Sequence, residues 1–156
     1  MLSKIYTVLI CSALFGLVAC EKGNNGLKAY NENEILFDKQ ITVINLWASW
    51  CEPCRKEIPE LSQLAKDNPD IRVVGIALDK RENVEKFLQS NPVVYPIRYH
   101  SKDATEIMLK FGNKSAGIPY TMVYAPQCGF KKSRVGPVSA KEIKTVLEEA
   151  KKQCNN

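Results

Sequence analysis

The chain has 156 residues, a formal net charge of +5, 45% apolar residues and six cysteines. At roughly 100–150 residues per domain, this length fits one domain with a short extra segment. With 25% charged residues, eight Gly and eight Pro, the composition excludes a coiled coil, a collagen-like chain and a largely disordered chain. Six cysteines are too few for a disulfide scaffold, and a core of this size does not need one. The modest positive charge does not favour nucleic-acid binding.

The first twenty residues have the pattern of an export signal. Lys4 is followed by an apolar stretch from Ile5 to Val18, and the sequence turns polar after Cys20. A basic start, an apolar centre and a small residue before the break are the parts of such a signal. The stretch is shorter than the roughly 20 apolar residues of a spanning helix. The alternatives are an uncleaved membrane anchor and a buried helix of the fold.

The end of this segment, Leu17-Val18-Ala19-Cys20, resembles the lipobox of bacterial lipoproteins. In that family the cysteine is lipidated and becomes the first residue of the mature chain. The resemblance implies a signal peptide over 1–19, acyl chains on Cys20 that hold the protein at a membrane, and a flexible tether over 20–32. It also implies an exported protein that faces the periplasm or the cell exterior. Glu21 after the cysteine favours, by the same resemblance, the outer membrane of a cell that has one.

Strand-like and helix-like segments alternate through the rest of the chain. Runs rich in β-forming residues predict strands, of which 42–48 and 71–78 are apolar enough to be covered on both faces. The expected strands are 34–38, 42–48, 71–78, 93–99, 120–124 and 130–135. The expected helices are 51–66 with Pro59 inside, 81–89, 104–111, and a last helix from the N-cap Ser139 to about 152. This order predicts an α/β fold with a central mixed β-sheet flanked by helices.

Cys51 and Cys54 enclose Glu52 and Pro53 between the first buried strand and the first helix. Cys51 would lie at the helix N-terminus, where unpaired N–H groups and the helix dipole lower a thiol pKa and favour a nucleophilic thiolate. Cys54 would lie one turn deeper on the same face, where it can attack a mixed disulfide at Cys51 and release the substrate. Pro53 is tolerated in a first helical turn.

Three other interpretations of this cysteine pair have less support in the sequence. A structural bridge across two residues removes little loop entropy. A zinc site needs a second pair of ligands, but the chain has one histidine, His100, and no second CxxC. Haem attachment would need a histidine after Cys54, where the sequence has Arg55. Redox chemistry by the dithiol is therefore favoured, and it needs neither a metal nor a cofactor.

Four features occur together between about residues 33 and 152: the segment NLWASWC, the CEPC pair, Pro59 inside the helix, and GIPYT at 117–121. They resemble the thioredoxin superfamily, in particular the membrane-tethered ResA/TlpA-type thiol-disulfide oxidoreductases. The resemblance implies a thioredoxin-like fold over 33–156 with a central β-α insertion at about 71–100. CEPC resembles the ResA branch, which reduces the haem-binding cysteines of apocytochrome c. The family resemblance further implies an integral-membrane thiol electron donor of the DsbD/CcdA type.

The resemblance also gives roles to residues around the cysteine pair. Pro119 should be a cis proline facing Cys51, and the Ile118 backbone should pair with an extended substrate segment. Trp50 should border the active site, whereas Trp47 belongs to the core. Asn45 stands where thioredoxin itself has a buried acid. A metal-free site is expected.

Glu52 has two interpretations that the sequence leaves open. A carboxylate beside the thiols opposes the thiolate, raises the pKa of the thiol and favours a reductant. Alternatively, Glu52 is a solvated acid in the first turn that complements the helix dipole.

Cys128 and Cys154 are interpreted separately from the resemblance, because the family pattern does not call for them. Cys128 lies in the turn of the closing hairpin, and the last helix should bring Cys154 back toward that turn. Two idle thiols are unusual after export, so we expect a structural disulfide that closes a 27-residue loop. The alternative is two separate thiols, with Cys154 in a frayed tail.

The sequence thus predicts an exported, lipid-anchored, monomeric enzyme that reduces protein disulfides through Cys51 and Cys54, with apocytochrome c as the favoured substrate. A thiol oxidase of the same fold is the alternative within the enzyme class, because direction follows the reduction potential. A non-catalytic lipoprotein that holds an extended peptide at Pro119 is the alternative from another class.

Overall fold

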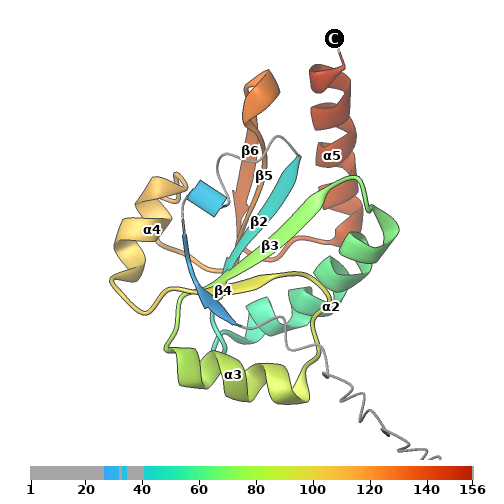
Figure 1. Cartoon of the computed structure of the whole chain (residues 1–156). Coiled ribbons are helices and arrows are strands. Elements are labelled where there is room, and N and C mark those ends of the chain that lie inside the picture. Colours follow the sequence, from blue (N-terminus) through green and yellow to red (C-terminus); the bar gives the residue numbers. More distant parts are fainter. Residues whose placement is uncertain (1–26, 32, 35–40, 156) are drawn as a thin grey trace, which may run out of the picture.

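The computed structural model describes residues 27–31, 33–34 and 41–155 (Figure 1). The expected signal peptide and Cys20 lie outside the described residues. In the part that the structure describes, no helix combines the length and the apolar character needed to cross a membrane.

Among the described residues, a six-stranded mixed sheet forms the centre of the fold, with the strand order β1-β4-β3-β2-β5-β6. Neighbouring strands are parallel from β1 to β2, whereas β5 and β6 are antiparallel to their neighbours. The strands are β1 (Lys28–Ala29), β2 (Thr42–Trp47), β3 (Arg72–Ala77), β4 (Ile97–Tyr99), β5 (Tyr120–Ala125) and β6 (Phe130–Val135). The helices are α2 (Glu52–Asp67), α3 (Arg81–Ser90), α4 (Ala104–Lys110) and α5 (Ala140–Cys154), with a short 3₁₀ turn η1 (Pro126–Cys128). The predicted α/β fold is confirmed.

Both faces of the sheet are covered, because alternate side chains of each strand point in opposite directions. In β2, Val43 and Trp47 pack into a core cluster with residues of α2, α3 and α5. Ile44 and Leu46 pack into a second cluster with residues of α4 on the other face. Figure 1 shows α4 on one side of the sheet and α2 and α5 on the other. This two-sided burial explains the near-continuous apolar run in β2.

The predicted start of the last helix is confirmed. The hydroxyl of Ser139 accepts a hydrogen bond from the Glu142 N–H, and the Glu142 carboxylate accepts one from the Ser139 N–H at 2.8 Å. This reciprocal cap satisfies two donors that a helix start leaves unpaired.

The expected strand at 93–99 is too long, since β4 begins only at Ile97. Pro96 has no N–H to donate to a ladder, and pairing with β3 starts at its carbonyl, which accepts from the Gly75 N–H at 3.0 Å.

The N-terminal boundary of the folded domain also needs correction. Lys28 and Ala29, inside the expected tether over 20–32, form β1 and pair with Arg98 and Tyr99. This pairing uses backbone groups of an exposed two-residue strand, so no apolar alternation marks it in the sequence. The domain therefore starts before residue 33.

The expected edge strand at 34–38 is wrong at its first residue, because Glu34 is helical. Its carboxylate pairs with the buried Arg98, and its carbonyl accepts from Arg72 at 2.8 Å. Residues 35–38 lie outside the described residues.

Cys128 and Cys154 form a disulfide in the structure, with their Cα atoms 5.0 Å apart. Cys128 ends η1 at the hairpin tip, and Cys154 ends α5. The side chain of Gln153 also donates to the Cys128 carbonyl at 2.8 Å. The hairpin tip and the end of α5 are therefore held together by a covalent bond and a hydrogen bond.

Replacing both Cys128 and Cys154 by serine should lower the free energy of unfolding by about 3 kcal/mol, because the unfolded chain gains the entropy of an open loop. Urea unfolding of the oxidised wild type and of the double variant measures this difference. Equal stability of the two proteins would show that the Cys128–Cys154 disulfide does not stabilise the fold.

Candidate active site

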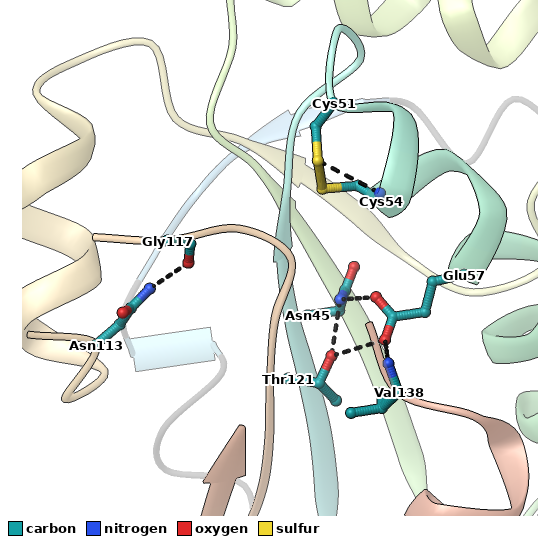
Figure 2. Close-up of a disulfide and its surroundings, with 8 residues drawn as sticks. All are labelled: Asn45, Cys51, Cys54, Glu57, Asn113, Gly117, Thr121 and Val138. Atoms are coloured by element: carbon teal, nitrogen blue, oxygen red, sulfur yellow. Dashed lines mark hydrogen bonds between the residues drawn. A yellow bond between two sulfur atoms is a disulfide. The ribbon is translucent and has the colours of Figure 1, made fainter. Parts of the chain in front are cut away.

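Cys51 lies at the junction between β2 and α2. Its N–H donates to the Ala48 carbonyl at 3.1 Å, and its carbonyl accepts from the Arg55 N–H at 3.1 Å. As the N-cap of α2, it also accepts a hydrogen bond at Sγ from the Cys54 N–H, at 3.3 Å (Figure 2). The sulfur therefore lies at the positive end of the helix dipole, where a thiolate is stabilised.

Cys51 and Cys54 are joined as a disulfide, with their Cα atoms 5.3 Å apart. Cys51 is 5% exposed, and Cys54 is completely buried. Of the two residues, only Cys51 presents any surface to a partner.

The aromatic and acidic neighbours of the pair differ in exposure. Trp50 is 70% exposed beside Cys51, whereas Trp47 is fully buried and packs against Phe87 with ring centroids 5.2 Å apart. Glu52 is exposed and pairs with Lys56 at 2.8 Å. The hydrogen bond from Lys56 lowers the pKa of Glu52. The geometry thus favours a solvated, paired acid at the helix start.

The loop before β5 contains a cis peptide bond between Ile118 and Pro119. Tyr120 follows directly and pairs with β2 close to the end from which the active-site turn leaves. Pro119 is buried, and Ile118 packs against the core cluster that contains both active-site cysteines. The side chain of Asn113 donates to the Gly117 carbonyl at 2.7 Å and so fixes the loop (Figure 2).

Glu57 lies one turn after Cys54 and is only 3% exposed. Its carboxylate accepts hydrogen bonds from the Val138 N–H at 3.0 Å and from Asn45 Nδ2 at 3.1 Å. Thr121 Oγ1 donates to it at 3.5 Å and accepts from the same Asn45 amide at 2.9 Å. Figure 2 shows this network below the disulfide.

Burial raises the pKa of Glu57 to about 7, although hydrogen bonds from Val138, Asn45 and Thr121 favour its charged form. Desolvation is thus the larger effect. A carboxyl that exchanges its proton near neutral pH therefore lies one helical turn from the second cysteine.

Sequence reasoning did not identify Glu57. A signal was available, because Glu57 is three residues after Cys54 and four before Leu61, on the buried stripe of α2. A second signal was Asn45, a polar residue in the apolar strand β2. The two polar residues meet across the interface between helix and sheet.

Among the described residues, no group of three or more His, Cys, Asp or Glu side chains is placed so that it could hold a metal ion.

A family model described as the AhpC/TSA family matches residues 19–131, which is most of the chain. The chain belongs to the AhpC/TSA family.

Two curated relatives point to the same class of enzyme. The sporulation thiol-disulfide oxidoreductase A of Bacillus subtilis is 29% identical over 116 residues, which cover 70% of this chain and 68% of that protein. The thiol-disulfide oxidoreductase ResA of Geobacillus thermodenitrificans is 28% identical over 112 residues, which cover 69% of this chain and 62% of that protein. With the Cys51–Cys54 pair at the CxxC position, these relatives make this AhpC/TSA-family chain a thiol-disulfide oxidoreductase.

A solved structure supports the fold. The crystal structure of a thioredoxin-related protein from Neisseria meningitidis serogroup B superposes with a TM-score of 0.68 at 37% identity, covering 74% of this chain and 87% of that one. The thioredoxin-like fold predicted from the sequence is thus confirmed, as is the resemblance to ResA-type enzymes.

The raised pKa of Glu57 makes the stability of the protein depend on pH. Between about pH 4.5 and 7 the folded protein holds a proton that the unfolded chain releases, so stability falls as pH rises through this window. The loss is roughly 1.4 kcal/mol for each unit of pKa shift. Glu57→Gln should remove this slope, because glutamine does not titrate.

Urea unfolding of the oxidised protein between pH 4 and 8 measures the slope without titration of the active-site thiols. Glu82→Gln, at an exposed acid of α3, is the matched control and should keep the wild-type slope. If the stability of Glu57→Gln has the same pH dependence as that of the control, Glu57 is not the group responsible for the slope.

Proposed function

We propose that this oxidoreductase reduces disulfides in exported proteins, with Cys51 as the nucleophile and Cys54 as the resolving thiol. The observation that carries the proposal is the difference between the two positions. Cys51 caps α2 and has exposed surface, whereas Cys54 is buried one turn deeper and its N–H reaches the Cys51 sulfur.

The reaction is two successive thiol-disulfide exchanges. The Cys51 thiolate attacks one sulfur of the substrate disulfide, a mixed disulfide forms, and one substrate thiolate leaves. The Cys54 thiolate then attacks the Cys51 sulfur, which closes the protein disulfide and releases the second substrate thiolate. Two electrons pass to the substrate, and its two sulfurs take up two protons. A dithiol donor must return both electrons, and an integral-membrane protein of the DsbD/CcdA type is the donor that we propose.

The substrate would lie along the loop before β5. Among the described residues, the backbone N–H and carbonyl of Ile118 make no hydrogen bond, so both are available to pair with an extended segment. Pro119 directly precedes Tyr120, which pairs with Leu46 near the end of β2 that leads to Cys51, and the exposed Trp50 offers an apolar surface next to Cys51. Glu52 and Pro53 complete the first turn between the cysteines.

Export and lipid anchoring are part of the proposal. The signal-like segment 1–19 and the lipobox-like Cys20 support a lipoprotein that faces the periplasm or the cell exterior. The Cys128–Cys154 disulfide is consistent with an oxidising compartment. Apocytochrome c is the proposed substrate, on the strength of the CEPC pair and the similarity to ResA.

A Cys54→Ser variant should accumulate a mixed disulfide between Cys51 and its substrate, because serine cannot carry out the second exchange. Non-reducing electrophoresis with mass spectrometry detects the linked partner. Cys51→Ser is the control and should trap nothing, since it removes the nucleophile. It should also abolish insulin reduction, which separates an enzyme from a non-catalytic peptide-binding protein. Failure of Cys54→Ser to trap any protein would contradict the proposed roles.

The direction of electron flow can be measured by equilibrating the Cys51–Cys54 dithiol against glutathione. A reductase should have a potential near that of thioredoxin, about −270 mV. A potential near that of the oxidant DsbA, about −120 mV, would instead establish a thiol oxidase.

A further inference from the structure

A groove of about 340 Å³ runs between α2, the end of α3 and the loop that follows α3. Arg55, Pro59, Ser62 and Lys66 contribute one continuous side of α2, at the spacing of a single helix face. Phe87 contributes from α3. The groove starts at the residue after Cys54 and leads away from the disulfide.

Among the described residues, no carboxylate lies within ion-pair distance of either cation of this α2–α3 groove, Arg55 or Lys66, and Arg55 acts on Glu52 only as a nearby charge that helps to lower the pKa of that acid. None of the acidic residues that the structure describes lines the groove. A second groove, between β6 and α5, contains Lys132 and Arg134, but Glu149 and Glu142 pair with them. The positive charge of the α2–α3 groove is therefore not neutralised in the same way.

The acids at the two ends of α2, Glu52 and Asp67, are already engaged. Glu52 pairs with Lys56 at 2.8 Å, on the exposed start of α2. Asp67 accepts from Gln63 at 2.7 Å and lies 3.4 Å from Lys144. Neither carboxylate lines the groove, so an incoming carboxylate would meet Lys66 without displacing a partner.

The rest of the lining mixes polar side chains, such as Gln63 and Asn91, with apolar ones, such as Phe87 and Val94. The Arg55 guanidinium lies 6.0 Å from the centre of the Phe87 ring, which forms part of the wall. Val94, on the rim, is 49% exposed, which is unusual for a large apolar side chain in this domain. Ser62 is 9% exposed, and its hydroxyl has no hydrogen-bond partner among the described residues.

We propose that the α2–α3 groove binds an acidic segment with interspersed apolar residues, located beside the disulfide of the protein substrate. This assignment rests on the proposed function and adds a class of substrate to it. Arg55 and Lys66 are eleven residues apart on α2, a rise of about 16 Å, which spans about five residues of an extended peptide. Acidic side chains would meet the two cations, and apolar ones would contact Phe87 and Val94.

The test uses three synthetic peptides that share one intramolecular disulfide followed by five residues. Leucine alternates with aspartate in the first peptide, with asparagine in the second and with lysine in the third. The measured quantity is the second-order rate constant with which the reduced full-length protein reduces each peptide. The aspartate peptide should react about fivefold faster than the asparagine peptide, and the lysine peptide more slowly than both. The difference should shrink at 0.5 M salt.

Lys66→Glu should abolish the preference for aspartate over asparagine. Lys141→Glu, on the exposed start of α5, changes the charge equally and should keep it. Equal rates for the three peptides in the wild type, or a preference that persists in Lys66→Glu, would contradict the proposed binding of acidic segments in the groove. Neither result would contradict the oxidoreductase activity. If the reduced protein reduces none of the peptides, the result contradicts the proposed reductase function and therefore also the substrate preference proposed for the groove.

Discussion

The buried carboxylate of Glu57 is the interaction on which the arrangement of this site depends. It connects α2 to β2 through Asn45, to β5 through Thr121, and to the chain just before α5 through the Val138 N–H. Because the group is buried, each of these donors offsets part of a desolvation cost that would otherwise disfavour the fold. The contacts fix the first turns of α2 against the sheet. The helix N-terminus that carries Cys51 is thereby held in place.

The same geometry gives the two cysteines different environments. Cys51 caps α2 and meets solvent at its edge, whereas Cys54 is enclosed between helix and sheet. A single helical turn thus separates a position open to a protein partner from a protected one. The β2–β5 pairing then brings the cis peptide before Pro119 to the same end of the sheet.

Most elements could be predicted from the sequence, because apolar periodicity and capping residues are local signals. The buried strand at β2, the helix after Cys51 and the cap at Ser139 all follow from such signals. The elements that were not predicted correctly have a common cause. β1 and the shortened β4 depend on backbone pairing between distant segments, and Glu34 is held by Arg98 from another part of the chain. None of these partners is visible in a local pattern.

The sequence by itself determined the chemistry of this protein: a CxxC pair at a strand-to-helix junction, in a chain whose apolar runs demand a sheet covered on both faces. Only the tertiary structure decided that Glu57 is buried with a pKa near 7, and that Arg55 and Lys66 share a groove without a carboxylate. The physical reason is that burial and ion pairing depend on neighbours far away in the chain. Tertiary packing sets how far a group is desolvated and whether its charge is paired. The reactivity of the cysteine pair, by contrast, depends first on two neighbouring cysteines at the N-terminus of a helix, which is a local feature of the sequence.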